Sequence, residues 1–148
     1  MKLRVRRMRA AGLLLQRQMD EFEAAMALQT RVLAIDEAAY GSEHTEVAIT
    51  LTNMGDVLET QGKLGEAMAA FERALELRDD HRGALQALAD IYREKDLFEH
   101  LCVVLQHLQA TADTEGETWS LASERANYLV EHLDRSHDAA AVLVAASR

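Results

Sequence analysis

The feature that most constrains the fold of this chain is an internal repeat. Residues 25–33 (AMALQTRVL) and residues 67–75 (AMAAFERAL) align without a gap, share five of nine residues and lie 42 positions apart. Farther along the chain the spacing becomes 34, where the apolar and acidic residues of 51–58 recur in 85–92. Units of this length are single supersecondary structures that bury their apolar faces against their neighbours, so the repeat predicts a stacked array.

Composition indicates that the repeated unit is helical. Among 148 residues, 49% are hydrophobic, only 5% are aromatic and none is proline. Because β-branched and aromatic residues are sparse, a β-sandwich or a parallel-sheet enzyme is disfavoured. A charged fraction of 28% beside so much apolar material is ordinary for a folded domain and disfavours disorder of the whole chain.

Each unit is predicted to contain two helices. In the second unit, Leu51, Met54 and Leu58 share one face of a helix over 45–60, and Gly62 suits the turn before a helix over 64–78. The third unit predicts helices over 82–94 and 97–111, with Asp79 and Asp80 as N-cap candidates. Residues 4–18 and 21–39 are predicted to form a front pair. A last pair is predicted to follow Thr114, which with Glu117 has the spacing of a capping box, and to run to about 146. The predicted units are therefore approximately 4–39, 45–78, 82–112 and 115–147, with seven or eight helices in all.

The unit resembles the tetratricopeptide repeat. The residues that carry the resemblance in the second unit are Leu51, Met54, Gly55, Leu58, Ala67, Phe71 and Ala74. In the third unit they are Leu85, Leu88, Ala89 and Tyr92, whereas Leu101, Leu105 and Leu108 replace the Ala-aromatic-Ala set. Residues 32–55 are similar to the 42-residue variant of kinesin light chains. The resemblance implies an all-α solenoid of antiparallel helix hairpins wound into a right-handed superhelix, which acts as a non-catalytic scaffold or adaptor for another protein.

The resemblance also implies which residues line the concave wall. The inward positions of the first helices are Ile49, Thr52, Asn53, Asp56, Glu59 and Thr60, then Gly83, Gln86, Ala87, Asp90, Arg93 and Glu94, then Glu117, Ser120, Leu121, Glu124, Asn127 and Tyr128. The predicted peptide groove consists of Asn53, Asp56, Glu59, Gln86, Asp90, Arg93 and Glu94. Because this wall is acidic and polar, it predicts a basic or mixed-charge peptide and disfavours an acidic C-terminal tail. Asn53 is either an amide that holds a peptide backbone or a solvated surface residue.

Net charge is distributed unevenly along the chain. Residues 1–19 carry six basic and no acidic residues, so the remainder of a chain with net charge −9 carries −15. This basic leader is a poor first helix, an organelle import signal, or an arm for nucleic acid or anionic lipid; the first alternative is favoured, because the acidic body would repel phosphates. The single Cys102 is predicted to be a small buried hydrophobe. With no apolar run long enough for a membrane span, we expect a cytoplasmic protein.

No pattern in the sequence predicts catalysis. The six histidines include no pair with the i, i+4 spacing of a helical zinc site, and His44 is better explained by packing or N-capping. There is no phosphate loop, dinucleotide fingerprint or nucleophile elbow. We therefore expect no enzyme activity, no metal, no cofactor and no small-molecule substrate.

The C-terminal helix predicts a further contact. Val142, Leu143 and Val144 leave an apolar edge where a terminal repeat usually has a polar face. A partner, a second copy of the chain or further residues would cover this edge. The last possibility makes the chain a regulatory segment of a longer protein, which is the main alternative to a free-standing adaptor.

Overall fold

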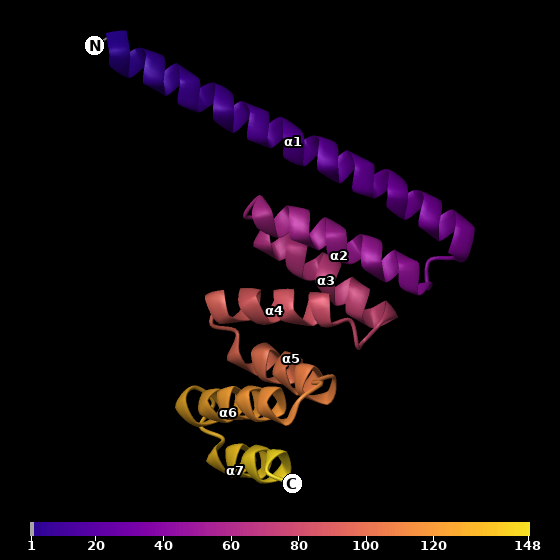
Figure 1. Ribbon diagram of the computed structural model, residues 1–148, viewed down its shortest axis with the longest axis vertical. Coiled ribbons are helices and arrows are strands. Elements are labelled where there is room, and N and C mark those ends of the chain that lie inside the picture. Colours follow the sequence, from indigo (N-terminus) through magenta and orange to yellow (C-terminus); the bar gives the residue numbers. More distant parts are fainter. Residues whose placement is uncertain (1) are drawn as a thin grey trace.

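Seven helices follow one another in series in the computed structural model, which describes residues 2–148 (Figure 1). Helix α1 is much longer than the others and projects beyond the stack at its N-terminal end (Figure 1). The bounds are α1 Lys2–Tyr40, α2 Thr45–Thr60, α3 Leu64–Leu77, α4 Arg82–Glu94, α5 Phe98–Ala110, α6 Glu115–Glu131 and α7 Ser136–Ala146. This part of the chain contains no strand, as an all-α array requires.

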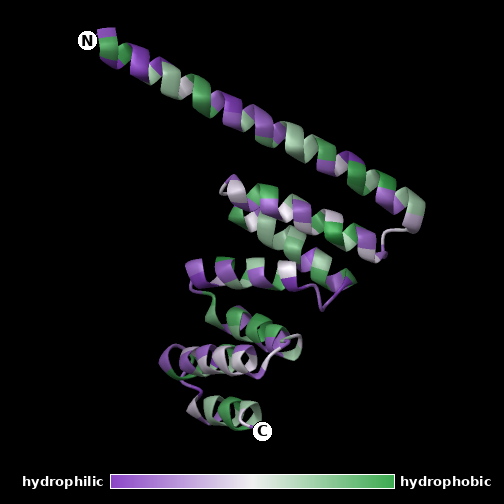
Figure 2. Ribbon diagram, in the orientation of Figure 1, coloured by the Kyte–Doolittle hydropathy of each residue, from purple (hydrophilic) through white to green (hydrophobic). Residues whose placement is uncertain are grey.

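The helices pack as an open stack rather than around a common centre. Every helix packs against the helices next to it in the chain, and α2 additionally contacts α4. By their bounds, α2, α4 and α6 correspond to the predicted first helices of the units 45–78, 82–112 and 115–147, and α3, α5 and α7 correspond to the predicted second helices. Figure 2 shows that α5 and α7 are mostly apolar, whereas α4 and α6 carry more polar residues. The architecture is that of a helical solenoid.

Helices α2 and α3 approach each other closely at Gly55. Gly55 on α2 faces the ring of Phe71, which is completely buried on α3. Ala67 and Ala74 flank Phe71 along the same side of α3 and are also completely buried. Small side chains at these three positions bring the two backbones together, and the aromatic ring fills the space between them.

Two buried clusters form the core. The larger one runs from α2 to α5 and includes Leu51, Leu58 and Leu105. A smaller one joins α5 to α6 and α7 through Cys102, Ala126 and Val142. Because each cluster is built by successive helices, every unit depends on its neighbour for burial of its apolar face.

Turns between paired helices share one backbone conformation. Gly62, Asp96 and Asp134 each follow a first helix and have φ of 78°, 56° and 50°. The predicted role of Gly62 is confirmed, since glycine adopts this left-handed conformation without strain. Aspartate is among the other residues that tolerate it, which explains how two turns form without glycine.

The helix N-termini follow the predictions in two cases of three. The side chain of His44 accepts a hydrogen bond from the amide of Glu46, and the hydroxyl of Thr114 accepts one from the amide of Glu117. The prediction that Asp79 or Asp80 caps α4 was wrong. His81 is the N-cap, and its Nδ1 accepts a hydrogen bond from the amide of Ala84. The chain starts its helix one or two residues later than the aspartates would require.

The front of the chain departs from the prediction of two helices over 4–18 and 21–39. The structure has one continuous helix, α1. Asp20 stands 42 residues before the turn residue Gly62, yet the helix does not break there. No proline or glycine lies between residues 13 and 40, and the side-chain amide of Gln16 donates a hydrogen bond to Asp20 Oδ1 at 3.0 Å across the expected break. These features favour continuation of the helix.

Candidate functional site

The predicted groove residues lie on two adjacent helices, α2 and α4. Of the seven, Asn53, Asp56, Gln86, Asp90 and Glu94 are exposed, whereas Glu59 and Arg93 are half-buried. The direct contact between α2 and α4 places these two rows of side chains on neighbouring helices of the stack. The surface they form, which we call the acidic wall, consists of Asp56 and Glu59 from α2 and Asp90 and Glu94 from α4.

The carboxylates of the acidic wall are close enough to affect one another. Burial raises the pKa of Glu59 above its ordinary value, and the negative charges of Asp56, Asp90 and Glu94 raise it further. Burial also raises the pKa of Asp56, although the nearby His81 opposes this effect. A cation beside Glu59 would offset its repulsion by the three acidic neighbours.

Arg93 is bound within the protein. Its Nε and Nη2 donate to the two carboxylate oxygens of Glu124 on α6, at 2.6 and 3.1 Å, and its Nη1 donates to Asp90 at 2.8 Å. A bidentate pair of this kind fixes the planar guanidinium in place. Arg93 therefore ties α4 to α6, a role that spacing along the sequence could not reveal because Glu124 lies 31 residues away.

Several residues assigned to the concave wall by resemblance pack inside the protein instead, and Ala87 is among them. Thr52 is buried, and its hydroxyl donates to the carbonyl oxygen of Ala48 at 2.9 Å. Leu121 and Tyr128 on α6 pack against the larger core cluster, and the ring of Tyr128 stacks on Phe98 with centroids 5.2 Å apart. Their apolar surface is worth more in the core than in a hydrated groove. The wall is consequently narrower on α6 than the resemblance implied.

A second arginine, Arg82, joins α4 to the end of α5 and the start of α6. Arg82 at the start of α4 donates to the carbonyl oxygen and the hydroxyl of Thr111, at 2.7 and 3.0 Å, and also pairs with Glu117. Arg82 thus binds a carbonyl oxygen at the end of α5 and a carboxylate in the first turn of α6 at the same time. Sequence analysis missed this residue, since its partners lie in two different helical regions.

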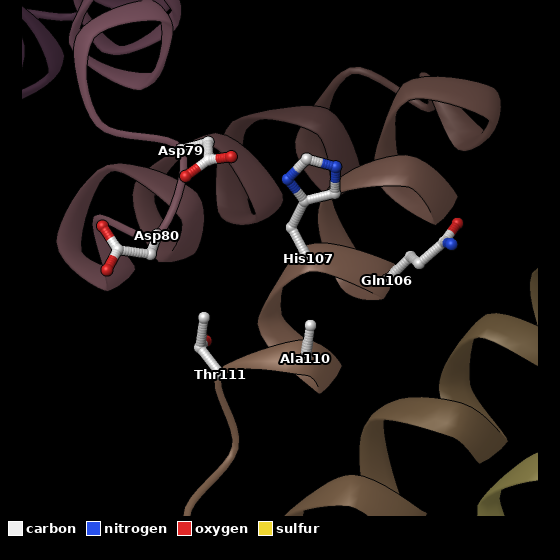
Figure 3. A pocket seen from close by; sticks show the side chains of 6 residues that line it. All are labelled: Asp79, Asp80, Gln106, His107, Ala110 and Thr111. Carbon is white, nitrogen blue, oxygen red and sulfur yellow. The ribbon is translucent and has the colours of Figure 1, made fainter.

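One hollow in the surface lies away from the acidic wall. Figure 3 shows Asp79 and Asp80 on the loop before α4, with His107 and Ala110 at the end of α5 and Thr111 just after it. Asp80 is already paired with Arg78, at 2.9 Å. The hollow is open and is lined by a loop and the end of a helix. Its side chains are not arranged as a nucleophile with a neighbouring base.

Residues 2–148 contain no cluster of metal-ligating side chains and no membrane-spanning helix. No three side chains of His, Cys, Asp or Glu in this range are grouped as metal ligands. None of the helices described combines the length and hydrophobicity needed to cross a bilayer. Cys102 is buried, and burial raises the pKa of its thiol, which disfavours the reactive thiolate.

Comparison with known families agrees with the hairpin geometry. A model of the tetratricopeptide repeat matches residues 7–80, which is half of the chain and covers α2, α3 and most of α1. The chain belongs to the tetratricopeptide repeat family. Repeats of this family are generally protein-protein interaction modules and typically non-catalytic scaffolds. No curated protein matches the chain.

Proposed function

We propose that this tetratricopeptide repeat protein is an adaptor that binds a basic, extended segment of another protein along the acidic wall. The observation that carries the proposal is the convergence of Asp56, Asp90 and Glu94 on Glu59, whose pKa is raised by burial and raised further by these three charges. A lysine or arginine side chain of the partner relieves this repulsion. Complementary charge also accelerates encounter and selects against acidic partners.

Asn53 is the proposed anchor for the partner's backbone. It is exposed on α2, three residues before Asp56 and therefore on nearly the same helix face. Its amide can donate to a peptide carbonyl and accept from a peptide N–H, which holds an extended chain without selecting its side chains. Charge selection then comes from the carboxylates on either side, and Gln86 on α4 can supply a further amide contact.

The internal binding of Arg93 supports this choice of partner. Two of the three guanidinium nitrogens of Arg93 donate to Glu124, and the third donates to Asp90. A ligand carboxylate would have to compete with both acids. A ligand ammonium group meets a carboxylate at each of the four wall positions, although Asp90 also accepts from Arg93.

The test uses fluorescence anisotropy with two labelled peptides of equal length, one with lysine and one with glutamate at alternate positions. We expect the lysine peptide to bind and the glutamate peptide not to bind. The double variant Asp56→Lys/Asp90→Lys should lower affinity at least tenfold, whereas Asp79→Lys/Asp80→Lys makes the same change of net charge outside the wall and should have little effect. Equal losses in both variants would mean that only net charge matters, and would refute a defined groove.

Two further measurements separate the parts of the proposal. Raising the salt concentration from 50 to about 500 mM should weaken binding, because exposed charges are screened. Asn53→Ala should lower affinity for the lysine peptide by about tenfold at any salt concentration, as expected for loss of hydrogen bonds of about 1.4 kcal/mol. Unchanged affinity in Asn53→Ala would remove the backbone anchor and leave only the electrostatic part.

A further inference from the structure

The first half of α1 is not covered by any other part of residues 2–148. All residues from 2 to 21 are exposed, and among them Leu3, Leu13 and Leu14 have exposed fractions of 64%, 73% and 62%. This segment lacks the tertiary packing that supplies most of the stability of helices in proteins. A row of large exposed apolar side chains on such a helix is typical of a protein contact.

One apolar row runs along almost the whole length of α1. It consists of Leu3, Ala10, Leu14, Leu28 and Ile35, whose spacings of 7, 4, 14 and 7 residues place them within one narrow sector of the helix. The four large members are between 58% and 64% exposed. We call this row the α1 stripe.

The α1 stripe lies on the side of α1 that faces away from α2. Met26 and Leu33 pack against the core, and Asp36 accepts a hydrogen bond from Thr50 of α2 at 2.7 Å. Leu28 and Ile35 each stand two residues farther along than Met26 and Leu33, which turns them to nearly the opposite side. The contact with α2 therefore leaves the stripe uncovered.

The repeat itself indicates that a helix belongs on this stripe. Leu28 and Ile35 stand 42 residues before Ala70 and Leu77 of α3. Ala70 and Leu77 are partly buried and pack against the core, because α3 has a helix on each side. Helix α1 has a helix on one side only. Its continuous course carries residues 2–19 away from the stack, as Figure 1 shows, so they do not cover Leu28 or Ile35 of their own chain.

Charge along α1 favours a second copy in antiparallel orientation. Residues 2–19 carry Lys2 and five arginines with no acid, whereas residues 20–40 carry five acids and one arginine, a net charge of −4. Parallel pairing would place six positive charges beside six others. Antiparallel pairing places each basic half beside an acidic half.

We propose that two copies of the chain dimerise through the α1 stripe, with their α1 helices antiparallel about a two-fold axis near residue 19. In this register Leu3 lies opposite the partner's Ile35, Ala10 lies opposite the partner's Leu28, and Arg17 lies opposite the partner's Glu21. The contact is isologous, so both stripes are covered at once. Each basic half then occupies the side of the partner's α1 that has no helix in the monomer. This surface is separate from the acidic wall, so the dimer and peptide binding can fail independently.

Sedimentation equilibrium of the full chain tests the oligomeric state. We expect a mass of twice the 16.5 kDa of one chain at micromolar concentration. Leu14→Glu/Leu28→Glu should return the mass to that of one chain without loss of helicity by circular dichroism, since both side chains are exposed. The control Val103→Glu/Val144→Glu changes two equally exposed residues on α5 and α7 and should leave the dimer intact. A monomeric wild type, or a dimer lost only in the control, which would place the contact on the C-terminal helices, overturns the proposal.

Cysteine cross-linking tests the register and excludes a folded-back monomer. In a Cys102→Ala background, a mixture of Leu3→Cys chains and Ile35→Cys chains should form a disulfide-linked heterodimer. Chains with Leu3→Cys alone should not cross-link, because the two copies of residue 3 would lie about 48 Å apart along the axis. If residues 2–19 instead fold back on their own chain, the Leu3→Cys/Ile35→Cys double variant cross-links within a monomer and the mixed sample forms no heterodimer, which contradicts the dimer.

Discussion

Substitution of Gly55 by alanine is a sharp test of the packing between α2 and α3. In an ordinary helix this change stabilises the folded state by about 1 kcal/mol, because glycine has the poorer helix propensity. At Gly55 the added Cβ would lie 2.6, 2.7 and 2.8 Å from Cε1, Cζ and Cδ1 of Phe71. Ordinary carbon contacts are about 3.5–4.0 Å long. One of the two helices, or the completely buried ring of Phe71, must therefore move by about 1 Å.

The net effect follows from the two opposing contributions. Overpacking in a filled core costs about 1–3 kcal/mol, which outweighs or cancels the propensity gain and leaves a loss of up to about 2 kcal/mol. Gly65 on α3 is the matched control, because no atom lies within 4 Å of its added Cβ. Gly65→Ala should stabilise the protein by roughly 0.5–1 kcal/mol.

Urea denaturation followed by circular dichroism measures both variants. We expect Gly55→Ala to unfold at a lower urea concentration than wild type and Gly65→Ala at a higher one. Phe71→Leu should restore part of the stability that Gly55→Ala loses, with a coupling energy of about 0.5–3 kcal/mol between the two sites. Equal stabilisation by Gly55→Ala and Gly65→Ala would refute the close approach of the two helices.

The remaining predictions concern charged residues. The pKa of Glu59 is raised in the folded state, so its ionised form destabilises the fold, and Glu59→Gln should raise stability at pH 7 by up to about 0.5 kcal/mol. Thermal melting should show that this gain fades as the pH falls through the raised pKa of the wild-type carboxyl. A gain that persists at pH 3 would contradict the electrostatic cause. The same variant should bind the lysine peptide less tightly, so that stability and affinity change in opposite directions. Arg93→Ala removes the tie between α4 and α6 and should cost about 0.5–1 kcal/mol. Fluorescence of Trp119 on α6 should then report unfolding at lower urea than circular dichroism does, and coincident transitions would show that the tie is not needed to couple the fourth unit to the rest.

The sequence by itself determined the class of fold and the boundaries of most helices. The repeat from 51 to 75 has the 3.6-residue period of apolar positions, and its small residues at 55, 67 and 74 allow two helices to approach. Both signals are local, so they can be recognised in the sequence without knowing which helices pack together. They predicted α2 to α5 to within one residue or so of the observed bounds. The cap at Thr114 and the turn at Gly62 were recognisable for the same reason.

Tertiary structure decided the features that depend on residues distant in the sequence. Arg93 and Arg82 are positioned by partners 29 to 35 residues away, so composition and spacing could not distinguish them from solvated charges. Asp20 also shows the limit of local information. Aspartate forms the turns at Asp96 and Asp134, where the helices on either side pack into a shared core. At Asp20, by contrast, the preceding helical segment is exposed and packs against no other part of residues 2–148. Without that packing energy a turn has no advantage over a continuous helix, because the helix keeps all its backbone hydrogen bonds.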